Sequence, residues 1–238
     1  MNNIVKRKIL GVDFSIISQK GVLEYIIKNI PKKTEKYYIV TPNPEILVIA
    51  QRDLNYQKVL NYAKLALPDG VGIMWAGKVL GVSLKGRIPG ADLMENLCKA
   101  AAKQPITVSF VGSRPGIADK AAECLKNKYS SLKIVFTGSE VTSFERLKGT
   151  DILFVAFGSP KQEFWMAKNL KKLPVKLAIG VGGAFDFASG EVTRAPLIVR
   201  WLGLEWLFRL IMQPWRAKRQ FSLLLFIYLV LREKFRLK

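Results

Sequence analysis

The stretch over 151–157 constrains the fold of this chain most, because it is apolar at nearly every position. A strand with one buried face alternates apolar and polar residues, whereas a near-continuous apolar run is typical of a parallel strand buried on both faces. Gly158 ends the run, and the residues after it predict a helix that reaches Leu170. This stretch therefore indicates one strand–helix unit of a parallel sheet.

The same alternation of strand and helix recurs along the chain. The pattern predicts strands at 8–12, 37–40, 106–111, 133–136, 151–157 and 176–181, a further short strand that ends before Pro68, and helices near 15–30, 91–103 and 117–128. Asn43 and Pro44 have the pattern of a helix N-cap and first turn. Repeated units of this length predict an α/β fold with a Rossmann-like parallel sheet and helices on both faces.

The pattern changes near residue 194, so we expect a core over 1–194 and a helical appendage over 195–238. From Arg194 onward the chain has ten Lys or Arg against Glu205 and Glu233, interleaved with Trp and Phe. The apolar run 221–231 is too short to span a bilayer, which needs about twenty residues. A helix in the membrane interface fits this composition. Core helices that pack on the sheet, or on a second subunit in a homo-oligomer, are the alternative.

Composition limits the chemistry. The net charge of +20 favours an anionic partner such as nucleic acid, a phospholipid surface or a phosphorylated substrate. The chain has no His, which removes Ser-His-Asp and Cys-His mechanisms and the commonest metal ligand. Cys98 and Cys124 lie in helical segments that suit buried, reduced thiols, and two cysteines are too few for a zinc site. The N-terminus lacks the apolar run of a signal peptide, so we expect a cytoplasmic protein.

Asp69 is the strongest candidate for a catalytic base. It follows a short apolar run that ends in Pro68, and Gly70 and Gly72 come after it. Ligands and reactive side chains of open α/β sheets lie at the carboxyl ends of strands, where we expect Asp69. An Asp before a helix is also a common N-cap with no chemical role, and the spacing alone leaves both interpretations open.

Other polar side chains follow predicted strands in the same way. Thr41 and Asn43 follow one strand, and Gln162 follows another, where an amide suits sugar hydroxyls or a nucleobase edge. Ser159 and Gln162 also fit a capping box. Arg87 lies in a loop that could fold over a pocket, although a lone loop arginine is more often solvated. Five arginines of the C-terminal segment could bind phosphate in bidentate fashion: Arg194, Arg200, Arg209, Arg216 and Arg219.

Two other functional classes fit part of the pattern. Glycine turns at 112–116 and 180–183 follow strands and could approach a pyrophosphate, but the second lacks the third glycine of the dinucleotide fingerprint. A nucleotide-dependent oxidoreductase is therefore weakly supported. A basic nucleic-acid-binding protein is suggested by the charge, but its basic residues are concentrated in an apolar tail and no RNA-binding motif occurs.

Six motifs in order along the chain resemble the WecG/TagA/CpsF glycosyltransferases, which form glycosyltransferase family 26. They are TPNPE at 41–45, PDGVG at 68–72, RIPGAD at 87–92, FVGSRPG at 110–116, FGSPKQE at 157–163 and VGGAFDF at 181–187. The resemblance runs from about residue 8 to about residue 220. Each motif alone is weak, but six in sequence are specific.

The resemblance implies an inverting, metal-independent hexosyltransferase without a cofactor. It implies transfer of N-acetylmannosamine or a related sugar from a UDP-sugar to undecaprenyl-diphosphate-linked N-acetylglucosamine, for cell-wall polysaccharides such as teichoic acids. The family's proposed base matches Asp69, and its pocket residues match Thr41, Asn43, Arg87 and Gln162. A C-terminal appendage would attach the enzyme to the inner face of the cell membrane and supply active-site arginines, which match Arg209, Arg216 and Arg219. No nucleic-acid partner is implied.

Overall fold

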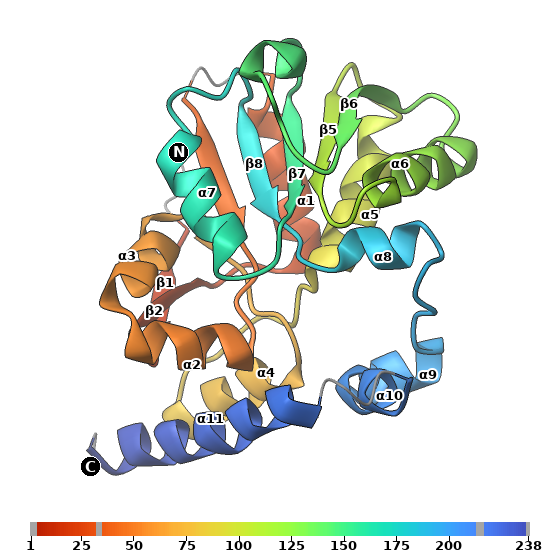
Figure 1. Cartoon of the computed structure of the whole chain (residues 1–238). Helices are drawn as coiled ribbons and strands as arrows, with labels where there is room; N and C mark the ends of the chain where they lie inside the picture. The colour runs from red at the N-terminus through yellow and green to blue at the C-terminus, as the bar shows by residue number, and fades with distance from the viewer. Residues whose placement is uncertain (1–3, 32–34, 213–216, 237–238) are drawn as a thin grey trace.

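A six-stranded parallel sheet forms the centre of the computed structural model, which describes residues 4–31, 35–212 and 217–236 (Figure 1). The order of the strands is β4-β3-β8-β7-β5-β6, and every neighbouring pair is parallel. The strands are β3 (Tyr37–Val40), β4 (Leu65–Ala66), β5 (Thr107–Gly112), β6 (Lys133–Gly138), β7 (Ile152–Ala156) and β8 (Leu177–Gly180). The predicted α/β class and parallel sheet are confirmed.

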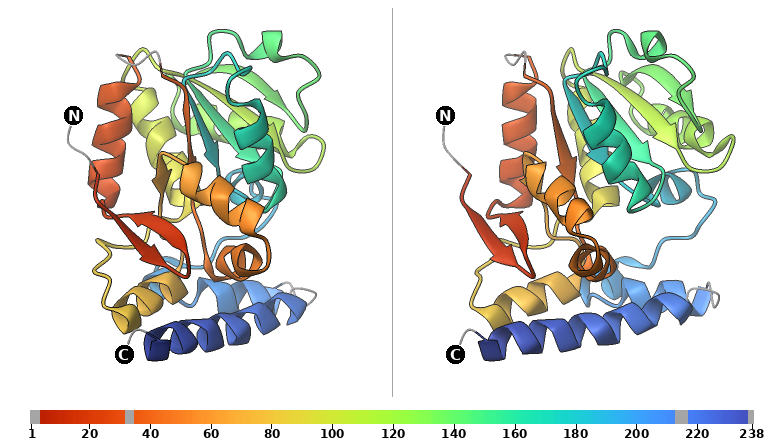
Figure 2. Two further views of the ribbon diagram at one scale, coloured as in Figure 1. Left: turned by 90° about the vertical axis from the view of Figure 1, so that its left-hand side faces the viewer. Right: turned by 60° about the vertical axis from the view of Figure 1, so that its left-hand side comes forward.

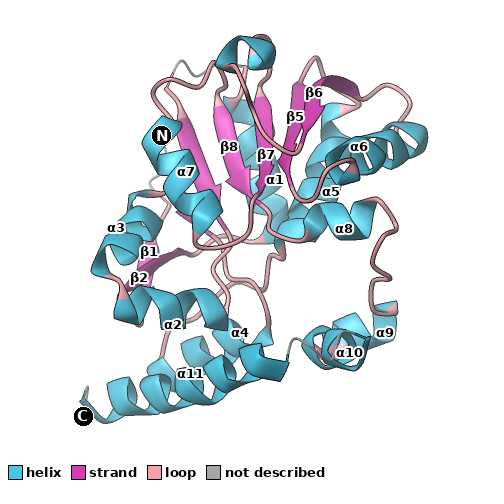
Figure 3. Ribbon diagram, viewed as in Figure 1, coloured by secondary structure: helices cyan, strands magenta, loops and turns pink. Residues whose placement is uncertain are grey.

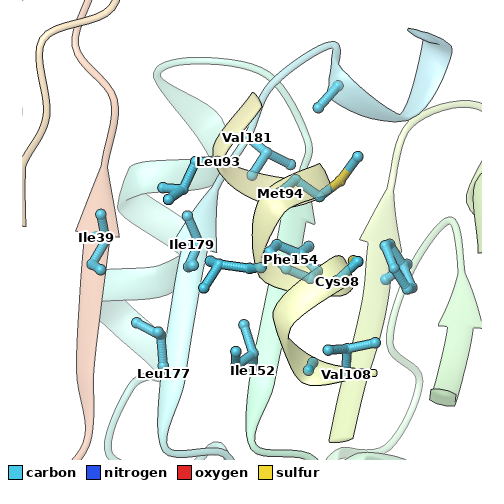
Figure 4. Close-up of a cluster of buried hydrophobic side chains, with 14 of the residues drawn as sticks. Ile39, Leu93, Met94, Cys98, Val108, Ile152, Phe154, Leu177, Ile179 and Val181 are labelled. Atoms are coloured by element: carbon cyan, nitrogen blue, oxygen red, sulfur yellow. The ribbon is translucent and has the colours of Figure 1, made fainter. Parts of the chain in front are cut away.

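Helices cover both faces of the sheet (Figure 3). One face packs on α1 (Gln19–Asn29), α5 (Gly90–Ala101), α6 (Ile117–Lys128) and α8 (Ala184–Ala188). The other packs on α2 (Pro44–Arg52), α3 (Leu54–Tyr62), α4 (Val71–Leu80) and α7 (Lys161–Asn169), with a short 3-10 helix η1 (Phe144–Leu147) near its edge. The all-apolar strand β7 is buried on both faces, as predicted: Phe154 belongs to the first cluster (Figure 4), and Leu153 belongs to the second.

The first predicted strand, 8–12, is wrong. The chain instead forms an antiparallel hairpin of β1 (Lys6–Ile9) and β2 (Val12–Ser15), separate from the main sheet. Leu10 and Gly11 both adopt positive φ angles in the turn between the strands. The apolar residues at 9, 10 and 12 therefore mark a buried turn against the second cluster rather than a continuous strand.

One predicted helix start is confirmed and another is wrong. Asn43 caps α2, with Pro44 at the first position. The capping box at Ser159 does not form: α7 begins at Lys161 without a side-chain cap, and the Ser159 hydroxyl donates to the Glu163 carboxylate at 2.8 Å instead. A hydrogen bond to a carboxylate is stronger than one between two neutral groups, which favours the bond from the Ser159 hydroxyl to Glu163.

Of the two cysteines, Cys98 is buried as expected, whereas Cys124 is exposed.

The described part of the C-terminal segment forms three helices, and the last one packs against the rest of the fold. They are α9 (Leu197–Trp201), α10 (Glu205–Met212) and α11 (Ala217–Arg236). Figure 2 shows α11 along the base of the molecule beside α4. Phe226 and Val230 of α11 are fully buried, and the ring centroids of Phe226 and Trp75 are 6.4 Å apart. The predicted domain boundary at residue 194 stays a prediction, but α11 shares its core with the preceding residues.

Candidate functional site

The carboxyl ends of β3, β4, β7 and β8 meet at one edge of the sheet, where two cavities adjoin. The smaller, of about 140 Å³, is here called the polar pocket, and the larger, of about 560 Å³, the apolar chamber. The polar pocket is lined among others by Thr41, Asn43, Asp69, Gln162, Gly182, Arg194 and Glu205. The apolar chamber is lined among others by Asn43, Asp69, Arg87, Trp75, Trp206, Glu205, Leu223 and Phe226.

Asp69 lines both cavities, at the point where they meet. Its backbone N–H donates to the Pro42 carbonyl at 3.0 Å, which ties the end of β4 to the end of β3. The N-cap of α4 is Gly70, with φ +89°, and Asp69 lies one position before it. The N-cap interpretation of Asp69 is therefore wrong. Asp69 lies at the wall of the cleft, where a base would have to be.

Thr41 and Asn43 enter the cleft from the end of β3. The buried Thr41 hydroxyl donates to the Gly180 carbonyl at 3.2 Å and so joins the ends of β3 and β8. Asn43 Oδ1 accepts the Ile46 N–H at 3.0 Å as the N-cap of α2. An Asn in this role has a fixed orientation, and it lines both cavities beside Asp69.

Gln162 lines the polar pocket from the first turn of α7. Its Oε1 accepts the Gly182 N–H at 3.1 Å, and its Nε2 donates to the Glu163 carboxylate at 2.7 Å. Glu163 is almost completely buried, and burial raises the pKa of its carboxyl group, against the lowering effect of the hydrogen bonds from Gln162, Ser159 and Tyr56. Residue types alone gave no sign of this network, because Tyr56 comes from a distant part of the chain.

Arg87 lines the apolar chamber and is not a solvated loop residue. Its loop is held at the end of β4, where the Ile88 N–H donates to the Pro68 carbonyl at 2.7 Å. The Arg87 guanidinium donates through Nη2 to the Arg200 carbonyl of α9. The loop therefore borders a cavity and also contacts the C-terminal segment.

Arginines of the C-terminal segment differ in their surroundings. Arg194 lines the polar pocket, but its guanidinium pairs with Asp92 at 2.7 Å and with Glu205 at 3.4 Å. It therefore fastens the segment to α5 rather than presenting a free charge. Position 209 lies in α10 and position 219 in α11, and Arg216 lies outside the described residues.

Sequence reasoning missed Glu205 as part of both cavities. One signal could have found it: Glu205 and Glu233 are the two acidic residues in a strongly basic segment. Glu233 ties that segment to the core directly, since its Oε1 accepts the Leu10 N–H at 3.2 Å, whereas Glu205 pairs with Arg194 of the same segment, which in turn pairs with Asp92 of α5. Of these two acidic residues, Glu233 therefore marks a place where the segment contacts the core.

Two kinds of structure are absent from the described residues. In the part of the chain that the structure describes, no helix combines the length and the apolar character needed to cross a membrane. The described His, Cys, Asp and Glu side chains also form no group of three suited to a metal ion.

Comparison with known proteins identifies the family. The model of the WecG/TagA/CpsF glycosyl transferase family matches residues 7–238. A Bacillus spizizenii protein named N-acetylglucosaminyldiphosphoundecaprenol N-acetyl-beta-D-mannosaminyltransferase is 34% identical, over 83% of this chain and 79% of its own. Proteins of the same name from Bacillus subtilis and Staphylococcus aureus are each 31% identical, over 89% and 100% of this chain and 86% and 96% of their own lengths. With nearly its whole length matched, this chain belongs to the WecG/TagA/CpsF family of glycosyltransferases.

Proposed function

We propose that this enzyme transfers N-acetylmannosamine from a UDP-sugar to N-acetylglucosamine linked through diphosphate to undecaprenol. The relatives' shared name supports the transferred sugar and the acceptor. The observation that carries the proposal is the position of Asp69, where a small polar pocket and a larger apolar chamber meet. A sugar donor and a lipid-linked acceptor need two such sites around one reacting centre.

Asp69 acts as the general base in this proposal. A hydroxyl of the acceptor sugar attacks the anomeric carbon of the donor, and its proton passes to the Asp69 carboxylate. The new glycosidic bond forms as the bond from the anomeric carbon to the UDP oxygen breaks. Attack opposite to the leaving group inverts the configuration at that carbon.

The donor occupies the polar pocket and the adjoining part of the chamber. Thr41, Asn43 and Gln162 supply hydroxyl and amide groups there. The departing diphosphate needs positive charge, which Arg87 and the family-matched Arg209, Arg216 and Arg219 supply. Positions 209 and 219 support this role because each lies within about one helical turn of a residue that lines the chamber, Trp206 and Leu223 respectively.

The lipid-proximal part of the acceptor enters the apolar chamber from the membrane surface. Trp75 and Trp206 line the chamber and are also partly exposed. The C-terminal helices carry further exposed apolar side chains, here together called the basal face: Leu197, Ile198, Trp201, Leu202, Ile211, Met212, Phe221, Leu224, Tyr228, Leu231 and Phe235. Peripheral attachment to the inner face of the cell membrane would cover this face.

A transfer assay with a panel of UDP-sugars and a short-chain lipid diphosphate N-acetylglucosamine acceptor tests the function. We expect product with UDP-N-acetylmannosamine, in the inverted configuration. Absence of transfer with every UDP-sugar would contradict the proposal. Thermal stabilisation by UDP but not by NAD separates it from an oxidoreductase on the same fold class.

A further inference from the structure

A buried cluster of polar side chains lies directly behind the polar pocket, between α3 and the first turn of α7. Glu163 is its centre and is 1% exposed, and Gln162 is 3% exposed. Gln162 lines the polar pocket, whereas Glu163 is not among the residues that line it. The carboxylate is therefore one side chain removed from the cleft.

Three donors converge on the Glu163 carboxylate. Oε1 accepts from the Ser159 hydroxyl at 2.8 Å and from Gln162 Nε2 at 2.7 Å, and Oε2 accepts from the Tyr56 hydroxyl at 3.0 Å. Among the described residues, no lysine or arginine forms an ion pair with it. A carboxylate buried without a cation is costly unless hydrogen bonds satisfy it, and here they do.

This arrangement determines which way the Gln162 amide faces. The oxygen and the nitrogen of an amide have nearly the same shape, so the hydrogen-bond partners set its orientation. Because Oε1 of Glu163 accepts, the NH₂ group of Gln162 must face it. The amide oxygen is then directed at the Gly182 N–H, 3.1 Å away. A reversed amide would place oxygen against oxygen and N–H against N–H.

The amide in turn holds the backbone that borders the polar pocket. Gly182 follows β8 with φ +53°, and Gly182 and Gly183 both line the pocket. The Gln162 amide also lies against Gly180, where a Cβ atom would be 3.0 Å from Nε2. A side chain at position 180 would therefore press on the amide.

We infer that Glu163 is a positioning residue: it fixes the orientation of the Gln162 amide and, through it, the conformation of the Gly182–Gly183 backbone at the donor pocket. The description of this pocket as the donor site rests on the proposed function. The positioning itself rests only on the hydrogen bonds. Glu163 Oε1 accepts whether or not the carboxyl group carries a proton on Oε2, so an uncharged amide can take its place.

Two variants and one control separate positioning from simple stabilisation. Glu163→Met fills the same space but leaves Gln162 without its acceptor. Glu163→Gln keeps an oxygen for Gln162. Leu173→Ala removes a fully buried side chain just after α7, which lowers stability through a core cavity and leaves the polar cluster untouched. The readouts are the UDP dissociation constant by calorimetry and the Gly182 amide exchange rate by NMR, with circular dichroism to check folding.

We expect Glu163→Met to weaken UDP binding and to speed Gly182 exchange by about tenfold each, because a buried hydrogen-bond chain is broken. Glu163→Gln should stay within about threefold of the wild type in both measurements. Leu173→Ala should bind UDP like the wild type. Unchanged UDP affinity and unchanged Gly182 exchange in Glu163→Met would overturn the inference, as would an equal loss of affinity in Leu173→Ala.

A charge swap keeps the test decisive if Glu163→Met does not fold. In the double variant Gln162→Glu with Glu163→Gln, the amide at position 163 donates to the carboxylate at position 162. That carboxylate still accepts the Gly182 N–H. Slow Gly182 exchange in this double variant supports the inference, and fast exchange in a folded double variant contradicts it. If the wild type itself does not bind UDP, the proposed donor site fails, while Gly182 exchange still decides the role of Glu163.

Discussion

Asp69 owes its place to the two residues that flank it. Pro68 lies two residues after β4, and its carbonyl accepts a hydrogen bond from the Ile88 N–H, in the loop that carries Arg87. Gly70 adopts φ +89°, which other residues rarely do, and it takes the N-cap position of α4 in place of Asp69. The strand-end position of Asp69 could be predicted from sequence. The choice of Gly70 rather than Asp69 as the N-cap could not be predicted, because it depends on the φ angle of Gly70.

At Ser159 the sequence predicts a helix cap that the structure does not form. Its spacing to Gln162 predicts a capping box, but Glu163 takes its hydroxyl. The reason lies in Tyr56, which precedes Glu163 by 107 residues in sequence and donates a hydrogen bond to the buried Glu163 carboxylate. A local pattern contains no information about such a partner. Asn43, whose capping involves only its own helix, was predicted correctly.

The pH dependence of stability tests the burial of Glu163. Burial raises the pKa of this carboxyl above its ordinary value of 4.5. The folded state therefore keeps a proton where the unfolded state has lost it, so this group lowers the free energy of unfolding as pH rises through and above 4.5. Glu163→Gln should lose this dependence, so its stability relative to the wild type should increase with pH.

Urea denaturation between about pH 4.5 and pH 8 measures this difference, on the scale that linkage between proton binding and folding sets. Glu123→Gln, which removes an exposed carboxylate from α6, controls for the loss of one negative charge. Parallel stability curves for the wild type and Glu163→Gln would show that the carboxyl titrates alike in the folded and unfolded states.

Helix α11 has two apolar faces, and only one of them is covered. Phe226, Leu229 and Val230 pack into the core with α2 and α4. The exposed residues Phe221, Leu224, Tyr228, Leu231 and Phe235 follow a spacing of three and four, which places them on one helical stripe. Sequence reasoning found a basic, aromatic tail, but periodicity could not say which of two apolar stripes would be buried.

Paired phenylalanines in α11 test whether the helix is part of the fold. Phe226 is fully buried, so Phe226→Ala should lower the free energy of unfolding by about 3–5 kcal/mol. Phe221 is 73% exposed in the same helix, so Phe221→Ala should change it by less than about 0.5 kcal/mol. Denaturant titration measures both values. Equal, small effects would mean that α11 does not dock on the core in solution.

Arg194 is expected to hold α9 and α10 against α5. Its guanidinium is mostly buried between Asp92 and Glu205, so Arg194→Ala should cost about 1–3 kcal/mol. Amide hydrogen exchange should increase in α9 and α10 and stay unchanged in α5. Arg114→Ala removes an exposed arginine that pairs with Glu191, and it should cost less than about 0.5 kcal/mol. Slow exchange in α9 and α10 of Arg194→Ala would contradict the role of this arginine.

At the scale of the whole molecule, the cleft and the basal face lie at the same end of the sheet (Figures 1 and 2). The strand–helix alternation and the carboxyl-edge site were predictable, because both follow from patterns within single units. The strand order, the separate hairpin and the docking of α11 were not, because each depends on contacts between residues far apart in sequence. The cleft itself is a product of those contacts: α10 and α11 form part of its wall.

Vesicle binding tests the basal face. We expect the protein to sediment with anionic phosphatidylglycerol vesicles, and less so with neutral vesicles or at high salt, because its excess charge is positive. Trp201→Ser combined with Phe221→Ser should reduce binding, since these side chains are 82% and 73% exposed. Tyr62→Ser, which removes an equally exposed ring beside the amino end of β4, should not. Equal binding by all variants would contradict membrane attachment through this face.

The role of Asp69 as the base is tested most directly by comparing the wild type with Asp69→Asn in the transfer of N-acetylmannosamine from its UDP-sugar to the lipid diphosphate acceptor. The variant removes the proton acceptor at nearly constant shape. We predict a loss of at least about a hundredfold in kcat, with UDP affinity within about threefold of the wild type. Transfer by Asp69→Asn at near the wild-type rate would contradict the mechanism.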